Sequence, residues 1–379
     1  MIYFSVAVWL FLYFLPPFLF LNSGYNFEIL QITTINLSFL LGLILAMYLT
    51  RNITTYQDYT NSYKVDARLF YFLFLVYFVV KFSTIIDITQ NLIQGSYVEY
   101  AYNKAIDRYE GSSYGNMSFF TRLGIVAFLM SGAVASVVKG SKKLVLFLFT
   151  LMILIESSSL ARLGVLLVFI TYVVEVVIRK NSYIQSKSVF SLLKLGLLLL
   201  LLLFFIFFFS AYFRVAHNDD VINIVFYKLG VYTIAMYEAL FIWMQNIGQY
   251  GDGYGTNTLA GIYKIFGYTT EQGFYKLVNT EFGPTNIYTN LRGFIADYGY
   301  FGTSVLFFTF GFILAYFSKV RYSNLTYMFL RLILFLLIFL LFSPFIHFNT
   351  FFAFVFSGIL IVGIKSKYYK VKFKKEHYE

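Results

Sequence analysis

Long apolar runs, each about 20 residues in length, fill most of this sequence and restrict what it can fold into. Hydrophobic residues make up 59% of the 379 positions and charged residues only 12%, compared with about 25% in soluble domains. A soluble core cannot bury so much apolar surface, so the sequence predicts a polytopic membrane protein. Strands of a membrane barrel would alternate apolar and polar residues, and these runs do not, so the spanning elements are predicted to be helices.

The apolar runs predict an all-α fold with about ten transmembrane helices. They occupy residues 2–21, 29–49, 69–88, 119–138, 144–160, 162–178, 192–212, 294–318, 328–345 and 347–364. No basic residue precedes the first run, which favours a retained helix over a cleaved signal peptide. The chain then divides into a first part of the bundle (1–212), one large loop (213–293) and a last part with a basic tail (294–379).

Lysine and arginine are distributed unevenly between the connections. The connections at 50–68, 139–143, 179–194 and 319–331, together with the tail 365–379, hold 19 of the 29 basic residues; with Glu175, near the inner end of the span 162–178, counted on the same side, their net charge is +14. The remaining residues carry a net charge of −3. Basic connections stay in the cytoplasm, so both termini are predicted to be cytoplasmic and the large loop to lie on the outer side. The formal charge of +11 therefore indicates orientation in a plasma membrane rather than nucleic-acid binding.

The large loop is predicted to contain one amphipathic helix over Val221–Asn246, because apolar residues recur there at three- and four-residue steps. We expect this helix to lie on the surface or over a cavity rather than to span the membrane. The sequence GDGYGTN follows it at 251–257. These glycines predict a flexible loop, since no strand precedes them and no lysine follows where a phosphate-binding loop needs one.

Three arginines are predicted at the outer ends of the apolar runs: Arg162, Arg214 and Arg292. Guanidinium groups bind phosphate oxygens in pairs and keep their charge at any pH. Fixed cations of this kind would stabilise the charge that develops on a departing lipid diphosphate, with no metal and no cofactor required. Headgroup contact remains the alternative reading for Arg162, and interfacial anchoring for Arg214. The absence of cysteine excludes thiolate metal sites and cysteine nucleophiles.

Polar residues concentrate in the stretch GPTNIYTNLRGFIADYGYFG, residues 283–302, just before and inside the start of an apolar run. Arg292 and Asp297 are five residues apart, so they do not form a simple ion pair on one helix face. Asp297 is a candidate base or a partner for another arginine, and Tyr288 offers a hydroxyl nearby. His217 is a further titratable candidate in the large loop, although a histidine in a polar loop is more often simply solvated.

The same stretch resembles the signature of bacterial O-antigen polymerases, the Wzy-type oligosaccharide repeat-unit polymerases. In the family signature, a Thr-Asn-x-Tyr-Thr segment is followed by an Arg and then by Asp-aromatic-Gly-x-x-Gly. The matching positions are Thr285, Asn286, Tyr288, Thr289, Arg292, Asp297, Tyr298, Gly299 and Gly302. The segment SSSLARLGVLL resembles the family's small-residue and Arg segment, with Arg162 in the Arg position. The number of spans and the late large loop also match.

The resemblance implies a GT-C-like glycosyltransferase at the periplasmic face of a bacterial inner membrane. Such an enzyme transfers a growing glycan from undecaprenyl pyrophosphate to the next lipid-linked repeat unit, and a polysaccharide chain-length regulator is an implied partner. Asn286 and Thr289 would contact the substrate. Asp297, Glu281 and His217 are the candidate bases, in that order.

Two alternatives remain open at this stage. One is a lipid-linked oligosaccharide flippase or another transporter, which should carry polar residues near the middle of its spans. The other is an O-antigen ligase. Ligases carry His-Asn before a comparable Gly-x-x-Gly, where this sequence has Tyr288 and Thr289, so the ligase is disfavoured.

Overall fold

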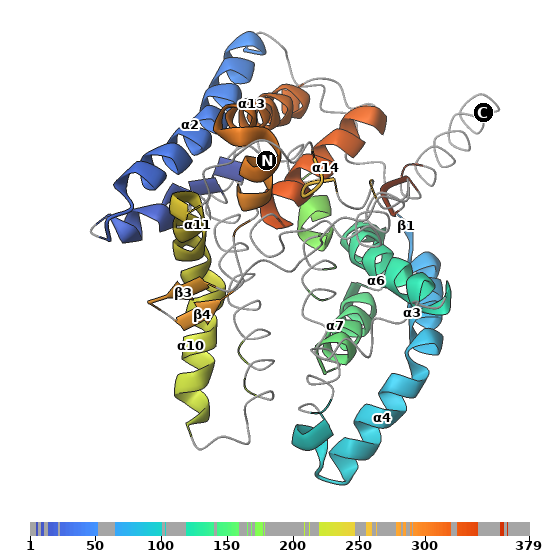
Figure 1. Ribbon diagram of the computed structural model, residues 1–379. Coiled ribbons are helices and arrows are strands. Elements are labelled where there is room, and N and C mark those ends of the chain that lie inside the picture. Colours follow the sequence, from blue (N-terminus) through green and yellow to red (C-terminus); the bar gives the residue numbers. More distant parts are fainter. Residues whose placement is uncertain are drawn as a thin grey trace, which may run out of the picture.

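The computed structural model of the chain is mostly helical (Figure 1). It describes residues 5–6, 9–10, 14–21, 23–51, 65–100, 103, 119–139, 142–158, 165, 168, 171–176, 178, 208, 212, 220–246, 255–259, 263, 278–281, 283–285, 289, 291–319, 324–339, 357–359 and 362. Within these residues two helices are long and apolar enough to cross a membrane, and a bent pair makes a third candidate. Apolar helices of this length indicate a membrane protein. The spans predicted at 192–212 and 347–364 lie largely outside the described residues, and those at 2–21 and 162–178 are described only in part.

The two long candidate spans are α2 (Asn26–Leu49) and α13 (Leu291–Lys319), which lie side by side in Figure 1. Glycines set how closely they pack. A Cβ on Gly42 would lie 2.0 Å from the Phe308 carbonyl oxygen, and one on Gly311 would lie 2.1 Å from that of Phe39. Small residues allow such backbone contact between membrane helices. Ser38 and Gly42 of α2 lie beside Ser304 and Phe308 of α13, so the two helices run in the same direction, as their predicted places as second and eighth spans require.

A second group of helices contains α3 (Ala67–Val80), α4 (Phe82–Ile93), α6 (Phe119–Val137) and α7 (Lys142–Ser158), on the right of Figure 1. The run predicted as one straight span at 69–88 is bent by 66° between α3 and α4. Lys81 lies at the bend, and its Nζ is 2.9 Å from Glu156 Oε1 on α7. A lysine in an apolar run can reach out to the headgroups, but here an ion pair to a neighbouring helix satisfies it instead.

Short strands show which connections lie at the same end of the molecule. Strand β1 (Val65–Asp66) pairs in parallel with β2 (Val138–Lys139). These strands belong to two of the connections predicted to be basic and to share one side. Their pairing places the ends of these two connections next to each other.

The large loop contains two helices where one was predicted. α10 (Val221–Thr233) and α11 (Ala235–Asn246) begin and end at the predicted residues, but Ile234 interrupts them. Of the two positions expected for this helix, on the surface or over a cavity, the surface one does not fit α11, because nine of its twelve residues are buried. One of the elements that pack on α11 is a hairpin that was not predicted, formed by β3 (Val278–Thr280) and β4 (Gly283–Thr285) (Figure 1).

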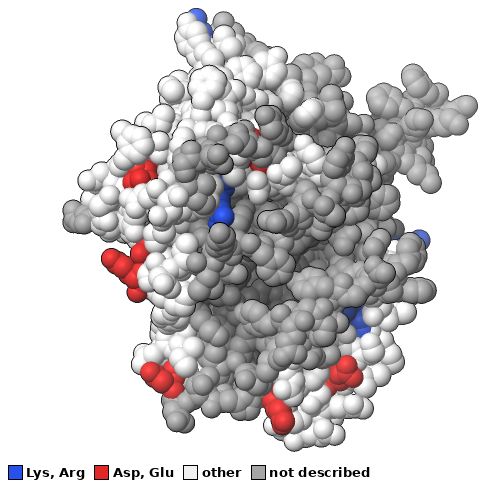
Figure 2. All heavy atoms as spheres, viewed as in Figure 1, with Lys and Arg blue, Asp and Glu red and all other residues white. Residues whose placement is uncertain are grey.

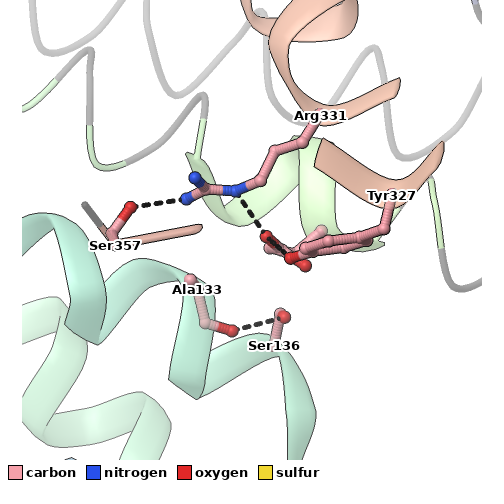
Figure 3. Close-up of polar contacts among 6 residues, drawn as sticks. Ala133, Ser136, Tyr327, Arg331 and Ser357 are labelled. Atoms are coloured by element: carbon pink, nitrogen blue, oxygen red, sulfur yellow. Dashed lines mark hydrogen bonds and ion pairs between the residues drawn. The ribbon is translucent and has the colours of Figure 1, made fainter. Parts of the chain in front are cut away.

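A buried ion pair joins α14 (Asn324–Phe339) to the segment at 171–176. Arg331 Nε lies 2.8 Å from Glu175 Oε1, which also accepts a 2.5 Å hydrogen bond from the Tyr327 hydroxyl. Arg331 Nη2 donates to Ser357 Oγ at 2.7 Å (Figure 3). Glu175 and Arg331 were both assigned to the basic side, and both are at least 98% buried. Because the buried pair contains one positive and one negative charge, leaving it out of the count does not change the predicted net positive charge of that side.

Exposed charges follow the predicted sides. Acidic side chains line the lower part of the molecule in Figure 2, over α4, α10 and the hairpin. Among the residues whose exposure is described, the exposed acids are Asp87, at the predicted outer end of the span 69–88, and Glu99, Asp220 and Glu281, in predicted outer connections. The exposed cations in the same part of the chain, Arg51, Arg68 and Lys143, all come from predicted inner connections.

Candidate functional site

The polar stretch singled out in the sequence forms the start of α13. Gly299 has φ 64° and ψ −178°, so α13 consists of a first segment, Leu291–Tyr298, and a longer one, Tyr300–Lys319, separated by a kink. This backbone conformation is almost restricted to glycine. Gly302 has a different role, since a Cβ there would lie 2.8 Å from the Tyr298 Cβ. The Gly-x-x-Gly pattern therefore makes the kink and leaves room for the tyrosine beside it.

Asp297 is buried in the first segment of α13 and faces a turn at residues 255–259. Its carboxylate accepts from the Asn257 backbone N at 3.1 Å to each oxygen and from Asn257 Nδ2 at 2.7 Å. It also accepts from the Thr258 backbone N at 2.6 Å and from Thr258 Oγ1 at 2.8 Å. Two successive backbone N–H groups and two side chains of the turn thus converge on one carboxylate.

The direction of one further hydrogen bond follows from this arrangement. Thr258 Oγ1 lies 3.0 Å from the Tyr298 hydroxyl. A threonine hydroxyl carries one proton, and that of Thr258 is directed to Asp297, so Tyr298 donates to Thr258. Gly255 starts the turn with φ +87°, which favours glycine. The turn is therefore attached to α13 through two consecutive residues, Asp297 and Tyr298.

Arg292 contacts a different part of the loop. Its guanidinium carbon lies 5.0 Å from the centre of the Trp243 ring of α11, within the range of a cation–π contact. Arg292 N donates to the Thr289 carbonyl at 3.1 Å, which closes the turn into the helix. Thr289 is fully buried, and no residue in the described part of the chain hydrogen-bonds to its Oγ1. Buried hydroxyls are nearly always hydrogen-bonded, so this oxygen marks a place where a ligand atom could bind.

A second carboxylate fixes the hairpin to α11. Glu238 is buried, and its two oxygens accept from the Glu281 backbone N at 2.9 and 3.0 Å. Burial raises the pKa of Glu238, and the Glu281 carboxylate raises it further, while the hydrogen bond opposes the rise. Burial also raises the pKa of Tyr25, which precedes α2, and the nearby Glu238 adds to this. Tyr25 stacks near Phe241 of α11, with ring centres 5.4 Å apart.

No protein-family model, curated protein or solved structure matches this chain. What the site can do chemically therefore rests on its own residues. Around the first segment of α13 they provide a guanidinium on an aromatic ring, a buried hydroxyl with no hydrogen-bond partner among the described residues, and a helix N-terminus, which favours anions.

Four of the predicted site residues lie in the described part of the chain. Asp297, Arg292 and Thr289 are together on or beside the first segment of α13, and Glu281 is exposed at the hairpin turn. The other five predicted residues lie outside the described residues, and they are Arg162, Arg214, His217, Asn286 and Tyr288.

The structure adds four residues to the candidate site: Trp243, Asn257, Thr258 and Glu238. Asn257 closes the glycine-rich sequence that predicted a loop, and Thr258 follows it. Glu238 was visible as a charge on an apolar helix, and such a charge needs a buried partner. No pattern in the sequence pointed to Trp243.

Proposed function

We propose that this chain is a membrane glycosyltransferase that polymerises lipid-linked oligosaccharide repeat units. It transfers a growing glycan from undecaprenyl pyrophosphate to the acceptor sugar of the next lipid-linked unit. The bundle has about ten spans in a bacterial plasma membrane, and the site faces the periplasm. No metal takes part in this proposed transfer.

The observation that carries the proposal is the group formed by Arg292, Trp243 and Thr289 at the start of α13. The guanidinium contacts the indole ring, and the planar arrangement of its N–H groups suits phosphate oxygens. The Thr289 hydroxyl is a further neutral donor, and the helix N-terminus favours an anion at this place. Such donors stabilise a departing diphosphate more than the intact lipid-linked sugar, because charge accumulates on the phosphate as the sugar bond breaks.

The place of this group in the fold suits a lipid-linked substrate. The first segment of α13 leads, after the kink at Gly299, into an apolar candidate span. A diphosphate at the helix start would therefore sit beside the surface against which a prenyl chain can lie. Arg162 and Arg214 are proposed to approach the same diphosphate.

The test is the length of the surface polysaccharide in a host strain that lacks the gene and carries variants of it. We expect Arg292→Ala to leave single capped repeat units and no ladder of long chains. Arg292→Lys should restore little, because an ammonium cannot bind a phosphate through a planar fork. Arg51→Ala is the matched control, because Arg51 also lies over an aromatic ring, 4.7 Å from the centre of the Tyr48 ring. Arg51 is exposed and follows the C-terminal end of α2, away from the start of α13. A normal ladder with Arg292→Ala would refute the proposal.

A lipid-linked oligosaccharide transporter is the second candidate, and the two ion pairs between helices favour it. Lys81–Glu156 and Arg331–Glu175 place charges inside the bundle, where transporters carry theirs. Loss of the gene distinguishes the two functions. A transporter mutant loses the capped single unit as well as the ladder, whereas a polymerase mutant keeps the single unit.

A further inference from the structure

We infer that Asp297 is a positioning residue that holds the turn at 255–259 on the first segment of α13. Residues 255–259, which include the end of the glycine-rich sequence, thereby become part of the site. The functional consequence rests on the proposed glycosyl transfer, but the attachment itself does not.

Geometry supports attachment over proton abstraction. Asp297 is 2% exposed, and each of its oxygens already accepts at least two hydrogen bonds from the turn. Three of the donors are backbone or amide N–H groups, which cannot take a proton from a carboxylic acid and pass it on. A base that removes a proton from an acceptor hydroxyl needs an oxygen within reach of that hydroxyl. Here the turn occupies both oxygens.

The composition of the turn fits this role. Gly255 supplies the positive φ that begins it, and a Cβ at this position would lie 3.3 Å from the Tyr298 hydroxyl. Asn257 and Thr258 then present two consecutive N–H groups and two side-chain donors to the same carboxylate. Because Tyr298 donates to Thr258, the next residue of α13 holds the turn from a second direction.

The consequence for the proposed transfer concerns the orientation of the first segment of α13. Arg292 faces Trp243 of α11, while Asp297, five residues further along, faces the turn. The turn and α11 therefore hold this segment from two different directions. We infer that the turn fixes the orientation of the segment, and with it that of Arg292 at the proposed diphosphate.

Hydrogen exchange of the purified full-length protein in detergent tests the attachment. A hydrogen bond to a carboxylate contributes about 1.5–3 kcal/mol, which corresponds to roughly 10- to 100-fold in exchange rate. Peptides that cover 255–259 should therefore exchange about 10- to 100-fold faster in Asp297→Ala. Thr258→Val and Asn257→Ala each remove one side-chain donor and should give smaller increases. Asp87→Asn, an exposed carboxylate change on α4, should change nothing at 255–259.

The same variants separate positioning from base catalysis in the host. If Asp297 positions the turn, Thr258→Val and Asn257→Ala shorten the polysaccharide, and Asp297→Asn, which keeps one acceptor oxygen, retains more long chains than Asp297→Ala. If Asp297 is a base, Asn and Ala are equally inactive while the two turn variants make normal polymer, and the inference is wrong. It is also wrong if exchange at 255–259 is unchanged in Asp297→Ala. Faster exchange with a normal ladder in every variant supports the attachment but refutes a role of the turn in the proposed transfer, which Arg292→Ala tests separately.

Discussion

Replacing Gly311 by alanine should separate α2 from α13, although alanine is normally the better helix former. The new Cβ would lie 2.1 Å from the Phe39 carbonyl oxygen, where ordinary contact begins at 3.4 Å, so the helices must part by about 1.3 Å. A gap of 0.5–1 Å already removes about a quarter to a half of a dispersion contact. The 2.8 Å hydrogen bond from Ser38 Oγ to the Ser304 carbonyl would also break.

Overpacking of this kind lowers the free energy of unfolding by about 1–3 kcal/mol. The higher helix propensity of alanine raises it by up to about 1 kcal/mol. We therefore expect Gly311→Ala to lower the free energy of unfolding by about 1–2 kcal/mol in a titration with SDS. Gly42→Ala should do the same, because its Cβ would meet the Phe308 carbonyl at the same crossing. The double variant should cost little more than either single one, since the first separation makes room for the second methyl group.

Val305→Leu is the matched control for this experiment. It also adds one carbon to α13, but on a face that is 48% exposed, so the unfolding free energy should change by less than about 0.5 kcal/mol. Full additivity of the two glycine variants, or an unchanged stability in both, would show that the helices do not meet at these glycines.

Three other changes test the remaining polar and backbone features. Arg331→Met should cost about 3–5 kcal/mol because it leaves Glu175 buried without its cation, while the additional change Glu175→Gln should restore most of the loss; equal stability of single and double variants in SDS would contradict the pair. Gly299→Ala should cost about 1–3 kcal/mol through the strained backbone and shorten the polysaccharide, and a normal ladder with normal stability would contradict the kink. The pKa of Glu238 is raised in the fold, so ionisation opposes hairpin docking: stability should be highest below the ordinary value of about 4.5 and decline as pH rises through the raised one. Glu238→Gln keeps an acceptor for Glu281 N and should remove this decline in thermal unfolding between pH 4 and 8; an identical pH profile would refute it.

Helices were predictable from this sequence where an apolar run ends in polar residues. The predicted ends of 221–246 coincide with the start of α10 and the end of α11. The break at Ile234 was not predictable, because neither proline nor glycine occupies that position. Burial of α11 also depends on contacts with the hairpin at 278–285, more than 30 residues further along the chain.

Partners of charged residues were harder to predict than their positions. Lys81 stood out as a cation in an apolar run, and Glu156 stood at the end of another, but 75 residues separate the two. For Asp297 the difficulty was different, since half of the groups that bind it are backbone N–H groups of a turn 40 residues earlier. Side-chain patterns carry no information about such donors. A glycine-rich sequence signals a turn but not the surface to which the turn attaches.

The first segment of α13 can hold two parts of the large loop because of the spacing of its charges. Arg292 and Asp297 are five residues apart, which is about 140° around a helix, so one faces Trp243 of α11 and the other faces the turn at 255–259. Two residues four apart would lie on the same side of the helix, so they would contact either α11 or the turn but not both. The kink at Gly299 then separates this segment from the part of α13 that packs on α2 through Gly311. A movement of the large loop can therefore displace the first segment without breaking the contact of α13 with α2 at Gly311.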